Sequence, residues 1–401
     1  MPWPLAFVLT IFAPLAAINY YVGRRLLDAI VEVFRQPRQK VRWILTLTLV
    51  YLNLLPVVFL ISYLLQGRTS AVAFSGEILL VDLLLTYPFW IALIITVQLF
   101  LLFALMEGFK LLLFPLYKSH KVRWLARERY ILLVASGVVT LYSLITIFAD
   151  TWLIRVTEHT VKLPAQYSAL DGVKIAQISD VQGDARTTER KLNDFVEKVN
   201  ALQPDLILFA GDVITSGTKY IEQTAGILQD LRAPYGVIAA VGDHDIFAGK
   251  SKVLQALHTS GIKVLEDTTI RLSLRNTDVN LSVVTYTYGR RPDRGDLEQL
   301  PIGPGESYRL MLAHQPAQRL VGFAAERGFH LFLAGHTHGG GIAFGIPGLF
   351  LVAPATFEGP YVSGSYRLEN MIISVTNGLG FTLAPVRYHA PAEITLLTLR
   401  K

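Results

Sequence analysis

The sequence contains no cysteine among its 401 residues. Disulfide bonds and thiolate metal ligands are therefore excluded, and either redox compartment is compatible with the chain. Charged residues are also scarce, at 17% of the chain, whereas hydrophobic residues make up 52%. This balance is too apolar for an ordinary soluble protein. The chain has no internal repeat and no low-complexity segment.

The shortage of charge is concentrated at the start of the chain. Residues 1–150 hold 13 Lys and Arg against 7 Asp and Glu, whereas residues 151–401 hold 24 of each sign. The basic pI of about 9.3 therefore belongs to the first part. A globular part without net charge is no argument for a nucleic-acid partner, and none is expected.

Four apolar stretches in residues 1–150 are long enough to cross about 30 Å of hydrocarbon at 1.5 Å per residue. They are Trp3–Val22, Trp43–Leu65, Ile78–Met106 and Tyr130–Ala149. A cleaved signal peptide is the alternative for the first stretch, but Arg24 and Arg25 follow that stretch instead of preceding it. Residues 1–150 are therefore predicted to form a transmembrane domain of about four helices.

The basic residues of this domain lie in two of its three connections. Connections 23–42 and 107–129 hold 12 of the 13 basic residues, whereas connection 66–77 holds only Arg68. The positive-inside rule places the two basic connections in the cytoplasm. Four spans then put both termini outside, so residues 168–401 are expected to be extracytoplasmic.

Residues 151–167 have mixed charge and contain Pro164, and we expect a linker there. Residues 168–401 alternate short β-type runs with helical patterns and then change to strands joined by turns. The predicted strands are Val173–Ser179, Asp205–Ala210, Gly236–Val241, Ile270–Arg275, Val279–Tyr286, Tyr308–Ala313, His330–Ala334, Leu349–Val352, Tyr361–Leu368, Met371–Thr376 and Glu393–Leu399. The predicted helices are Thr187–Leu202, Lys219–Leu231, Lys252–Ser260 and Ala317–Arg327. This order favours an α/β fold with two packed sheets and helices outside.

Acidic and histidine residues follow several of these strands, where ligands of open sheets collect. Alone, each has an ordinary explanation as a turn aspartate or a core histidine. Together, carboxylates and imidazoles suit Mn²⁺, Fe or Zn²⁺. Two such ions about 3.5–4 Å apart can clamp a phosphate and activate a bridging water. The set consists of Asp180, Asp212, Asp243, His244, His314, His336 and His338.

The order of these motifs resembles the calcineurin-like metallophosphoesterase family over about Lys174–Leu399. The family pattern is D-x-H, G-D, G-N-H-(D/E), a lone His and G-H-x-H. This chain has Asp180-Val181-Gln182, Gly211-Asp212, Gly242-Asp243-His244-Asp245, His314 and Gly335-His336-Thr337-His338. The segments Ala313–Pro316, His338–Gly340 and Asn377–Gly380 are similar to the bacterial membrane-tethered branch. The resemblance implies a four-layer α/β/β/α sandwich over 168–401, and a bacterial inner or plasma membrane as location.

The resemblance also implies a role for each motif residue. The first metal would take Asp180, Gln182, Asp212 and His338, and the second Asp212, Asp243, His314 and His336. His244 would be the catalytic acid near the leaving group, and Asp245 would orient it.

Two positions depart from the family pattern, because Gln182 replaces a histidine and Asp243 replaces an asparagine. A glutamine carbonyl oxygen is a weaker ligand than imidazole. The aspartate adds negative charge, so the centre becomes harder and more anionic. We therefore expect two divalent ions, with Mn²⁺ favoured and Fe, Zn²⁺ or Mg²⁺ as the other candidates.

The loop Tyr286–Ser307 contains Arg290, Arg291 and Arg294. Arginine forks match phosphate geometry, which makes the loop a candidate substrate lid; the alternative is a solvated surface loop.

The predicted function is a membrane-anchored, dinuclear-metal-dependent phosphoesterase that hydrolyses phosphate ester or pyrophosphate bonds. A tethered hydrolase outside the cytoplasm favours a lipid-linked or envelope substrate: a phospholipid, a polyprenyl phosphate or pyrophosphate, or a lipid-linked sugar. The family's hydrolases of UDP-2,3-diacylglucosamine act in the cytoplasm, which the predicted topology disfavours. The alternative is a catalytically weak or inactive metal-binding envelope sensor or assembly protein, which Gln182 alone supports.

Overall fold

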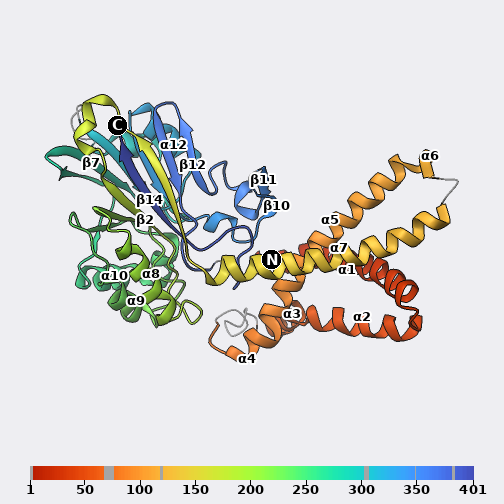
Figure 1. Cartoon of the computed structure of the whole chain (residues 1–401). Helices are drawn as coiled ribbons and strands as arrows, with labels where there is room; N and C mark the ends of the chain where they lie inside the picture. Colours follow the sequence, from red (N-terminus) through yellow and green to blue (C-terminus); the bar gives the residue numbers. More distant parts are fainter. Residues whose placement is uncertain (1–2, 67–75, 118–120, 302–306, 348, 382–383) are drawn as a thin grey trace. The chain divides into compact units, whose positions relative to one another are not determined.

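The computed structural model describes residues 3–66, 76–117, 121–301, 307–347, 349–381 and 384–401 (Figure 1). The chain forms two compact units, Met1–Phe148 and Ala149–Lys401.

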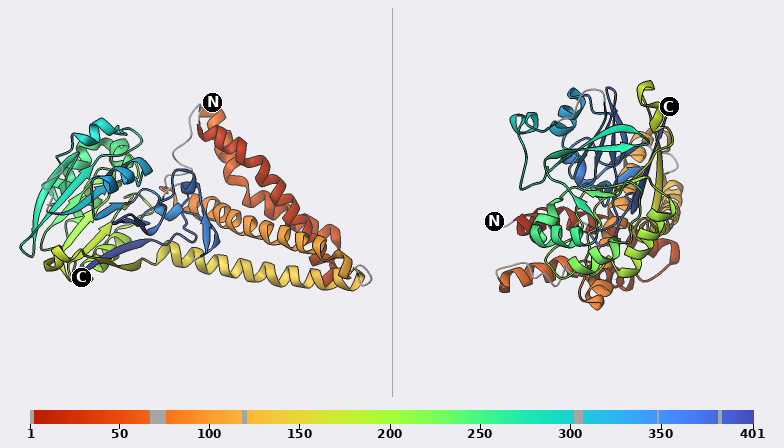
Figure 2. Two further views of the ribbon diagram at one scale, coloured as in Figure 1. Left: turned by 90° about the horizontal axis from the view of Figure 1, so that it is seen from above. Right: turned by 90° about the vertical axis from the view of Figure 1, so that its left-hand side faces the viewer.

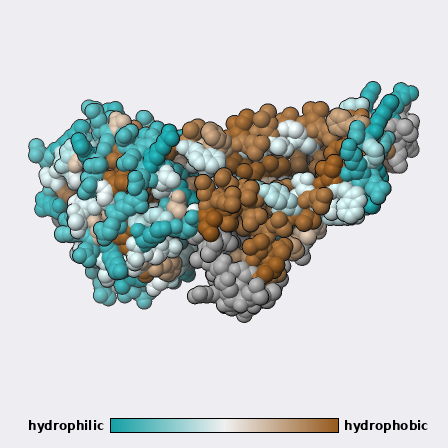
Figure 3. All heavy atoms as spheres, turned by 90° about the horizontal axis from the view of Figure 1, so that it is seen from below, coloured by the Kyte–Doolittle hydropathy of each residue, from teal (hydrophilic) through white to brown (hydrophobic). Residues whose placement is uncertain are grey.

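The first unit is helical. Its elements are α1 (Trp3–Phe34), α2 (Arg38–Leu52), α3 (Leu54–Gln66), α4 (Leu79–Val81), a π-helical turn (Asp82–Thr86), α5 (Tyr87–Leu112), α6 (Phe114–Tyr117) and α7 (Lys121–Trp152). The ribbons of α1, α5 and α7 converge toward one end of this unit (Figure 2). Side chains of the three helices, among them Val22, Phe103 and Leu132, form a small core. The outward faces of the helices remain apolar (Figure 3), as expected for helices that contact lipid.

The structure confirms membrane-type helices but does not confirm four of them. Within the described residues, Leu79–Leu112 and Arg123–Trp152 are each long and apolar enough to cross a membrane. Helix α2 and residues Leu54–Ile61 of α3 meet at a bend of 47°, and together they count as a third span if the pair crosses as one. The predicted connection with Arg68 lies largely outside the described residues. The count of four stays a prediction.

Ion pairs bring the two basic connections of this unit together. Arg25, in the C-terminal third of α1, pairs with Glu107 of α5 and lies 2.6 Å from Glu128 of α7. Lys110 is 3.0 Å from Glu128. Hydrophilic side chains gather at this end of the unit in Figure 3. Both basic connections therefore lie at the same end of the helices.

The second unit contains two six-stranded sheets. The first has the order β1-β14-β2-β3-β4-β5 and the second β12-β13-β9-β8-β7-β6. The strands of the first sheet are β1 (Arg155–Lys162), β14 (Glu393–Arg400), β2 (Lys174–Ile178), β3 (Leu206–Phe209), β4 (Val237–Ala239) and β5 (Lys263–Val264). Those of the second are β12 (Gly364–Leu368), β13 (Met371–Val375), β9 (Leu331–Ala334), β8 (Tyr308–Ala313), β7 (Thr277–Val284) and β6 (Thr268–Leu274). A separate hairpin pairs β10 (Phe344–Ile346) with β11 (Phe350–Val352).

Helices cover the outer face of each sheet (Figure 1). The α-helices are α8 (Glu189–Ala201), α9 (Ile221–Leu228), α10 (Asp243–Thr259), α11 (Arg294–Glu298) and α12 (Gln318–Glu326), and the 3₁₀ turns are Ala165–Leu170, His338–Gly340 and Pro354–Phe357. Strand β3 shows that the first sheet is covered on both faces, because all four residues of this strand are buried although successive side chains point to opposite faces. Leu206 and Leu208 point into the core between the sheets, and Phe209 points into the core under α8, α9 and α10. A third core joins the second sheet to α12. The predicted α/β/β/α sandwich is confirmed.

The predicted linker over 151–167 is wrong. Residues 155–162 form strand β1, which pairs in parallel with β14 from Arg155 opposite Glu393 to Lys162 opposite Arg400. Strand β1 is an edge strand with several exposed polar side chains, so its local sequence looks like a linker. Its partner lies more than 200 residues later in the chain, where local sequence patterns do not reach.

Candidate metal centre

The predicted ligands all follow strands of the two sheets. Strands β2, β3 and β4 run parallel in the first sheet, and β8 and β9 run parallel in the second. Parallel strands bring their carboxyl ends to one edge, and the loops after them meet there. The structure thereby brings together Asp180, Gln182, Asp212, Asp243, His314, His336 and His338.

One group of ligand atoms consists of Asp243, His314 and His336. The Asp243 Oδ2 atom is 3.4 Å from His314 Nε2 and 3.2 Å from His336 Nδ1. The two ring nitrogens are 3.3 Å apart. Three potential ligand atoms thus converge on one point, as a divalent ion requires.

The second group consists of Asp180, Asp212 and His338. The Asp180 Oδ1 atom and the Gln182 Oε1 atom are both fully buried without a hydrogen-bond partner. Buried acceptors are rarely left unpaired, and a cation would satisfy both. The donors present therefore fit a metal ion, and Gln182 retains an oxygen to offer to it.

Asp212 lies between the two groups. Its Oδ2 atom accepts a hydrogen bond from Gln182 Nε2 at 2.9 Å and is 3.3 Å from His314 Nε2. Its Oδ1 atom accepts a hydrogen bond from the His244 backbone N–H at 2.8 Å. The predicted bridging position is consistent with this placement.

The backbone of the centre is strained at five predicted ligands. Left-handed φ angles occur at all of them, although non-glycine residues seldom adopt such angles. Strain of this kind persists only where the surrounding structure enforces it, and it concentrates at functional sites. The five are Asp180 (48°), Gln182 (52°), Asp212 (59°), His336 (71°) and His338 (51°).

The Asn377–Gly380 segment closes over the Asp180 loop. The backbone N–H groups of Leu379 and Gly380 donate to the Asp180 carbonyl oxygen, at 3.2 and 2.7 Å. Gly378 has a φ of +67°, and a Cβ there would lie 2.6 Å from the Asp180 Cβ. Only glycine fits this close approach. The segment therefore holds a ligand loop in place.

The electrostatics of the centre suit cations. Burial acts to raise the pKa of Asp243, but hydrogen bonds from His314 and His336 outweigh it and hold that pKa far below its usual range. Burial acts to lower the pKa of His314, yet Asp212 and Asp243 raise it well above its usual value. Without a metal, His314 therefore carries a proton that offsets the buried carboxylates. A divalent ion held by Asp243, His314 and His336 would supply that positive charge instead, and His314 would bind it without the proton.

The ring orientation of His314 is set by the Ala210 carbonyl oxygen, which lies 2.7 Å from Nδ1. Assigning the Nδ1 proton to this hydrogen bond leaves Nε2 facing the carboxylates as a ligand atom. Burial, followed by the charge of Arg387, lowers the pKa of His338 well below its usual value. That imidazole is neutral, as metal binding requires.

The structure gives a local reason for aspartate at position 243. The Asp243 Oδ1 atom accepts a hydrogen bond from the Tyr288 backbone N–H at 2.5 Å, and Oδ2 accepts one from Gln315 Nε2 at 2.7 Å. An asparagine would place its NH₂ group against one of these donors. Both carboxylate oxygens are thus matched by N–H groups of this chain.

The predicted role of Asp245 in orienting His244 is wrong. The Asp245 carboxylate accepts hydrogen bonds from the backbone N–H groups of Asp212, Val213 and Gly242, all at 2.8–2.9 Å. His244 Nδ1 instead lies 2.5 Å from the Thr215 carbonyl oxygen. Adjacent residues at the start of α10 point in different directions, so Asp245 holds the ligand loops together while Thr215 orients the imidazole.

Arg387 is a supporting residue that the sequence motifs do not reveal. Its side chain is fully buried, and its guanidinium donates to the carbonyl oxygens of Asn377, Gly380 and Ala390 at 2.6–3.0 Å. One of its nitrogens, Nη2, is 3.5 Å from His338 Nδ1. Arg387 thus connects the Asn377–Gly380 segment to a predicted ligand.

Glu358 and Tyr288 also contact the centre. A Glu358 carboxylate oxygen is 3.0 Å from His336 Nε2, and the Tyr288 hydroxyl donates to Glu358 at 3.0 Å. The three arginines of the predicted lid differ in their contacts. Arg290 pairs with Asp267 and Arg294 with Glu298 and Glu326, whereas the Arg291 guanidinium lies 5.6 Å from the Tyr288 ring centroid.

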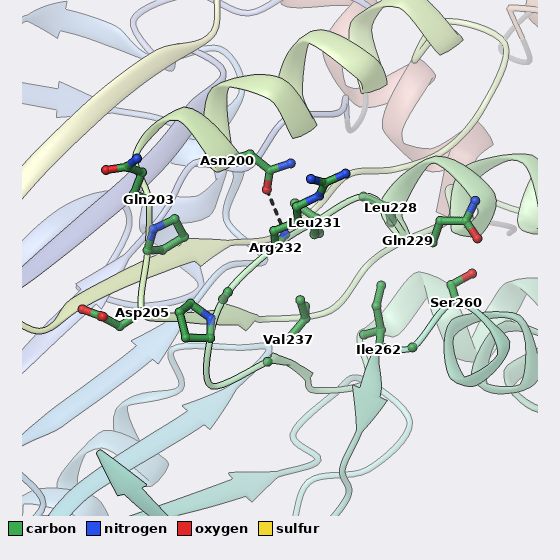
Figure 4. Close-up of a pocket in the computed structure, with 15 residues that line it drawn as sticks. Asn200, Gln203, Asp205, Leu228, Gln229, Leu231, Arg232, Val237, Ser260 and Ile262 are labelled. Carbon is green, nitrogen blue, oxygen red and sulfur yellow. Dashed lines mark hydrogen bonds between the residues drawn. The ribbon is translucent and has the colours of Figure 1, made fainter. Parts of the chain in front are cut away.

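A separate surface cavity of about 670 Å³ lies at the opposite edge of the first sheet (Figure 4). It is bordered by Asp205 and Val237, at the starts of β3 and β4, and by Arg232, whose backbone N–H donates to Asn200 at 2.8 Å. Its single carboxylate, Asp205, already accepts a hydrogen bond from the Lys174 N–H. It has no part in the metal centre.

Comparisons with known proteins point to the same chemistry. Residues 173–340, which contain all the predicted ligands, match the family model described as calcineurin-like phosphoesterase. The uncharacterized metallophosphoesterase YkuE of Bacillus subtilis is 31% identical over 63% of this chain and 88% of its own length.

Two other relatives are longer than the matched region. An uncharacterized metallophosphoesterase of Campylobacter jejuni is 30% identical over 57% of this chain and 59% of its own length. A transmembrane protein with metallophosphoesterase domain from Danio rerio is 28% identical over 69% of this chain and 63% of its own length. The chain thus spans less than two thirds of these two proteins.

Proposed function

The chain belongs to the calcineurin-like phosphoesterase family and is a metal-dependent phosphoester hydrolase, and we propose that it works on membrane-bound substrates through a dinuclear centre. The observation that carries this proposal is the pair of buried ligand groups that meet at Asp212. One group would hold the first ion and the other the second. The bond that is cleaved is a phosphate ester or pyrophosphate bond.

The chain's own residues have distinct tasks in this chemistry. Two divalent ions held by these groups would neutralise phosphate oxygens and lower the pKa of a water molecule. His244 is oriented by Thr215 through Nδ1, so its Nε2 atom is left to carry a proton to the leaving oxygen. Ser179 donates to the Asp180 carboxylate, and the His336 backbone N–H donates to the same oxygen at 2.9 Å.

The proposed metal is Mn²⁺. Three carboxylates and the Gln182 carbonyl oxygen give the centre more oxygen donors than the family pattern provides. Harder oxygen ligands favour Mn²⁺ or Mg²⁺ over Zn²⁺.

Removing the metal tests this assignment. The full chain, purified in detergent, is expected to hydrolyse bis(p-nitrophenyl) phosphate, to lose this activity on treatment with a chelator, and to regain it with Mn²⁺ more fully than with Zn²⁺. Hydrolysis that survives chelation would contradict a metal-dependent mechanism. Metal binding without hydrolysis under any condition would instead support the alternative function, a metal-binding envelope sensor or assembly protein.

We also propose that the hydrolase domain lies outside the cytoplasm, on a bacterial inner or plasma membrane. Both basic connections lie at one end of the first unit, and Arg123, Arg127 and Arg129 belong to the first turns of α7. The positive-inside rule puts that end of α7 in the cytoplasm, whatever the number of earlier spans. The second unit begins at the other end of α7.

A reporter that is active only outside the cytoplasm tests this orientation. Fusion after Lys401 is expected to be active, whereas fusion after Gln36, between α1 and α2, is expected to be silent. The reverse pattern would place the hydrolase domain in the cytoplasm. A cytoplasmic nucleotide-linked substrate would then be favoured over an envelope substrate.

The proposed substrate is lipid-linked: a phospholipid, a polyprenyl phosphate or pyrophosphate, or a lipid-linked envelope sugar. Helix α7 ends at Trp152 and β1 begins at Arg155, so only two residues separate a candidate membrane span from the sandwich. A hydrolase held this close to its anchor is suited to a substrate in the same membrane.

A further inference from the structure

Exposed apolar side chains of the second unit gather around the metal centre. Among the residues of 155–401 that the structure describes, every strongly exposed large apolar side chain lies near position 247, near position 288 or within 346–357. We define the apolar rim as Phe247, Tyr288, Ile346, Leu349, Val352 and Phe357. Three segments far apart in the sequence thus contribute to it.

The apolar rim lies directly beside the metal centre. The Phe247 ring lies 6.0 Å from the His244 ring, and the Tyr288 ring lies 5.3 Å from the His336 ring. Phe357 precedes Glu358, whose carboxylate contacts both Tyr288 and His336. The β10–β11 hairpin follows the His338–Gly340 turn without another element between them. An occupant of the rim therefore lies beside the reacting groups.

The rim is unusually apolar for a water-facing surface. Phe357 is 87% exposed and Leu349 is 74% exposed. The 19 residues from Gly339 to Phe357 include no charged residue, although residues 151–401 as a whole hold 48 charged residues. An isolated two-stranded hairpin is marginally stable in water, and a contiguous exposed apolar patch marks an interaction surface.

The chain enters the second unit at the same edge. Arg155, the first residue of β1, is paired with Glu393, and the Glu393 N–H donates to the Gly378 carbonyl oxygen in the segment over the Asp180 loop. Just before β1, the Thr151 hydroxyl oxygen accepts a hydrogen bond from the Arg387 N–H at 3.0 Å. Thr151 belongs to the last turn of α7, a candidate membrane span. The edge with the centre and the rim is therefore the edge that is joined to the membrane helix.

We propose that the apolar rim binds the lipid bilayer that anchors α7, with Leu349 and Phe357 inserted at the level of the headgroups. The inference rests on the proposed membrane anchoring. A bilayer fits because it is the apolar phase within reach of this edge. Arg291, exposed beside Tyr288, is placed to meet lipid phosphates. The substrate phosphate then reaches the centre without leaving the membrane surface.

The absence of native cysteine makes a direct test simple. Leu349→Cys and Phe357→Cys are each labelled with an environment-sensitive fluorophore, and the full chain is placed in nanodiscs of phosphatidylethanolamine and phosphatidylglycerol. Quenching by spin-labelled lipid is compared with quenching by iodide in the water. The matched control is Ser273→Cys, an exposed position near the end of β6, at the sheet edge remote from the centre.

Rim labels are expected to be quenched strongly by lipid and weakly by iodide, and the control label to show the reverse. Insertion to about 5–10 Å predicts stronger quenching by a shallow spin label than by a deep one. If the rim labels are quenched like the control label, the inference is overturned. It is also overturned if the rim labels are protected from both quenchers, because that result would assign the rim to a protein partner. The readout does not depend on catalysis. An active hydrolase without lipid quenching would sink this inference alone, and an inactive protein with lipid quenching would sink the proposed hydrolysis alone.

Discussion

Replacement of Asp212 by alanine is expected to reduce kcat/KM for bis(p-nitrophenyl) phosphate on the order of a thousandfold, or about 4 kcal/mol of transition-state stabilisation. The Asp212 carboxylate lies between both ligand groups, 3.3 Å from His314 and in hydrogen-bond contact with Gln182. Its removal takes one ligand from each proposed ion. It also frees the start of α10, because Oδ1 accepts the His244 N–H.

The control for this variant is Asp278→Ala, because Asp278 is an exposed carboxylate that pairs with Arg271 on the surface. Its rate is expected to equal that of the unmodified chain. Metal content and thermal unfolding, measured on both variants, separate loss of the ions from loss of the fold. Equal hydrolysis by Asp212→Ala and the unmodified chain would contradict the enzyme proposal outright.

Replacement of Arg387 by methionine is expected to destabilise the second unit on the order of 4 kcal/mol, because several buried carbonyl oxygens lose their donor at once. Those oxygens belong to Asn377, Gly380 and Ala390, all in hydrogen-bond contact with the guanidinium. For a unit of this size the loss corresponds to a fall in Tm of roughly 10 °C. Thermal unfolding of the full chain in detergent measures it.

Arg387 is also expected to act as a positioning residue for His338, whose Nδ1 atom it contacts. Loss of such a supporting partner commonly weakens metal binding by about 10–100-fold. Mn²⁺ titration at a temperature where both proteins are folded measures this effect separately from stability. Arg387→Lys keeps the positive charge but loses the several N–H donors of the guanidinium. Its Tm and its Mn²⁺ affinity are therefore expected to lie between those of the unmodified chain and those of Arg387→Met. An unchanged Tm and an unchanged Mn²⁺ affinity in Arg387→Met would refute both roles.

Local sequence patterns predicted the strands that carry the ligands. The run before Asp180 and the run before His314 are short, buried and ended by polar residues, and both are strands in the structure. Their convergence could be predicted as well, because parallel strands align their carboxyl ends. The family prediction rested on this ordered set and is confirmed.

Features that depend on distant partners could not be predicted in this way. Strand β1 forms by pairing with β14, which lies far away in the sequence. Arg387 donates hydrogen bonds to backbone carbonyl oxygens, which every residue has, so no sequence motif identifies its partners. Glu358 lies 22 residues beyond His336 and outside every motif, so its contact with that ring follows only from the fold. Helix α10 begins at Asp243 and not near Lys252, because Gly249, with a φ of 114°, interrupts the helical pattern between them.

The two residues between α7 and β1 span at most about 7 Å even when fully extended. With α7 in a membrane, the hydrolase is confined to a thin layer beside it and does not sample the surrounding volume. Encounters with the proposed lipid-linked substrate would then occur by diffusion in two dimensions. The turnover rate in that setting follows the number of substrate molecules per unit area, so diluting the substrate with inert lipid slows the reaction even when the amount in the sample is constant.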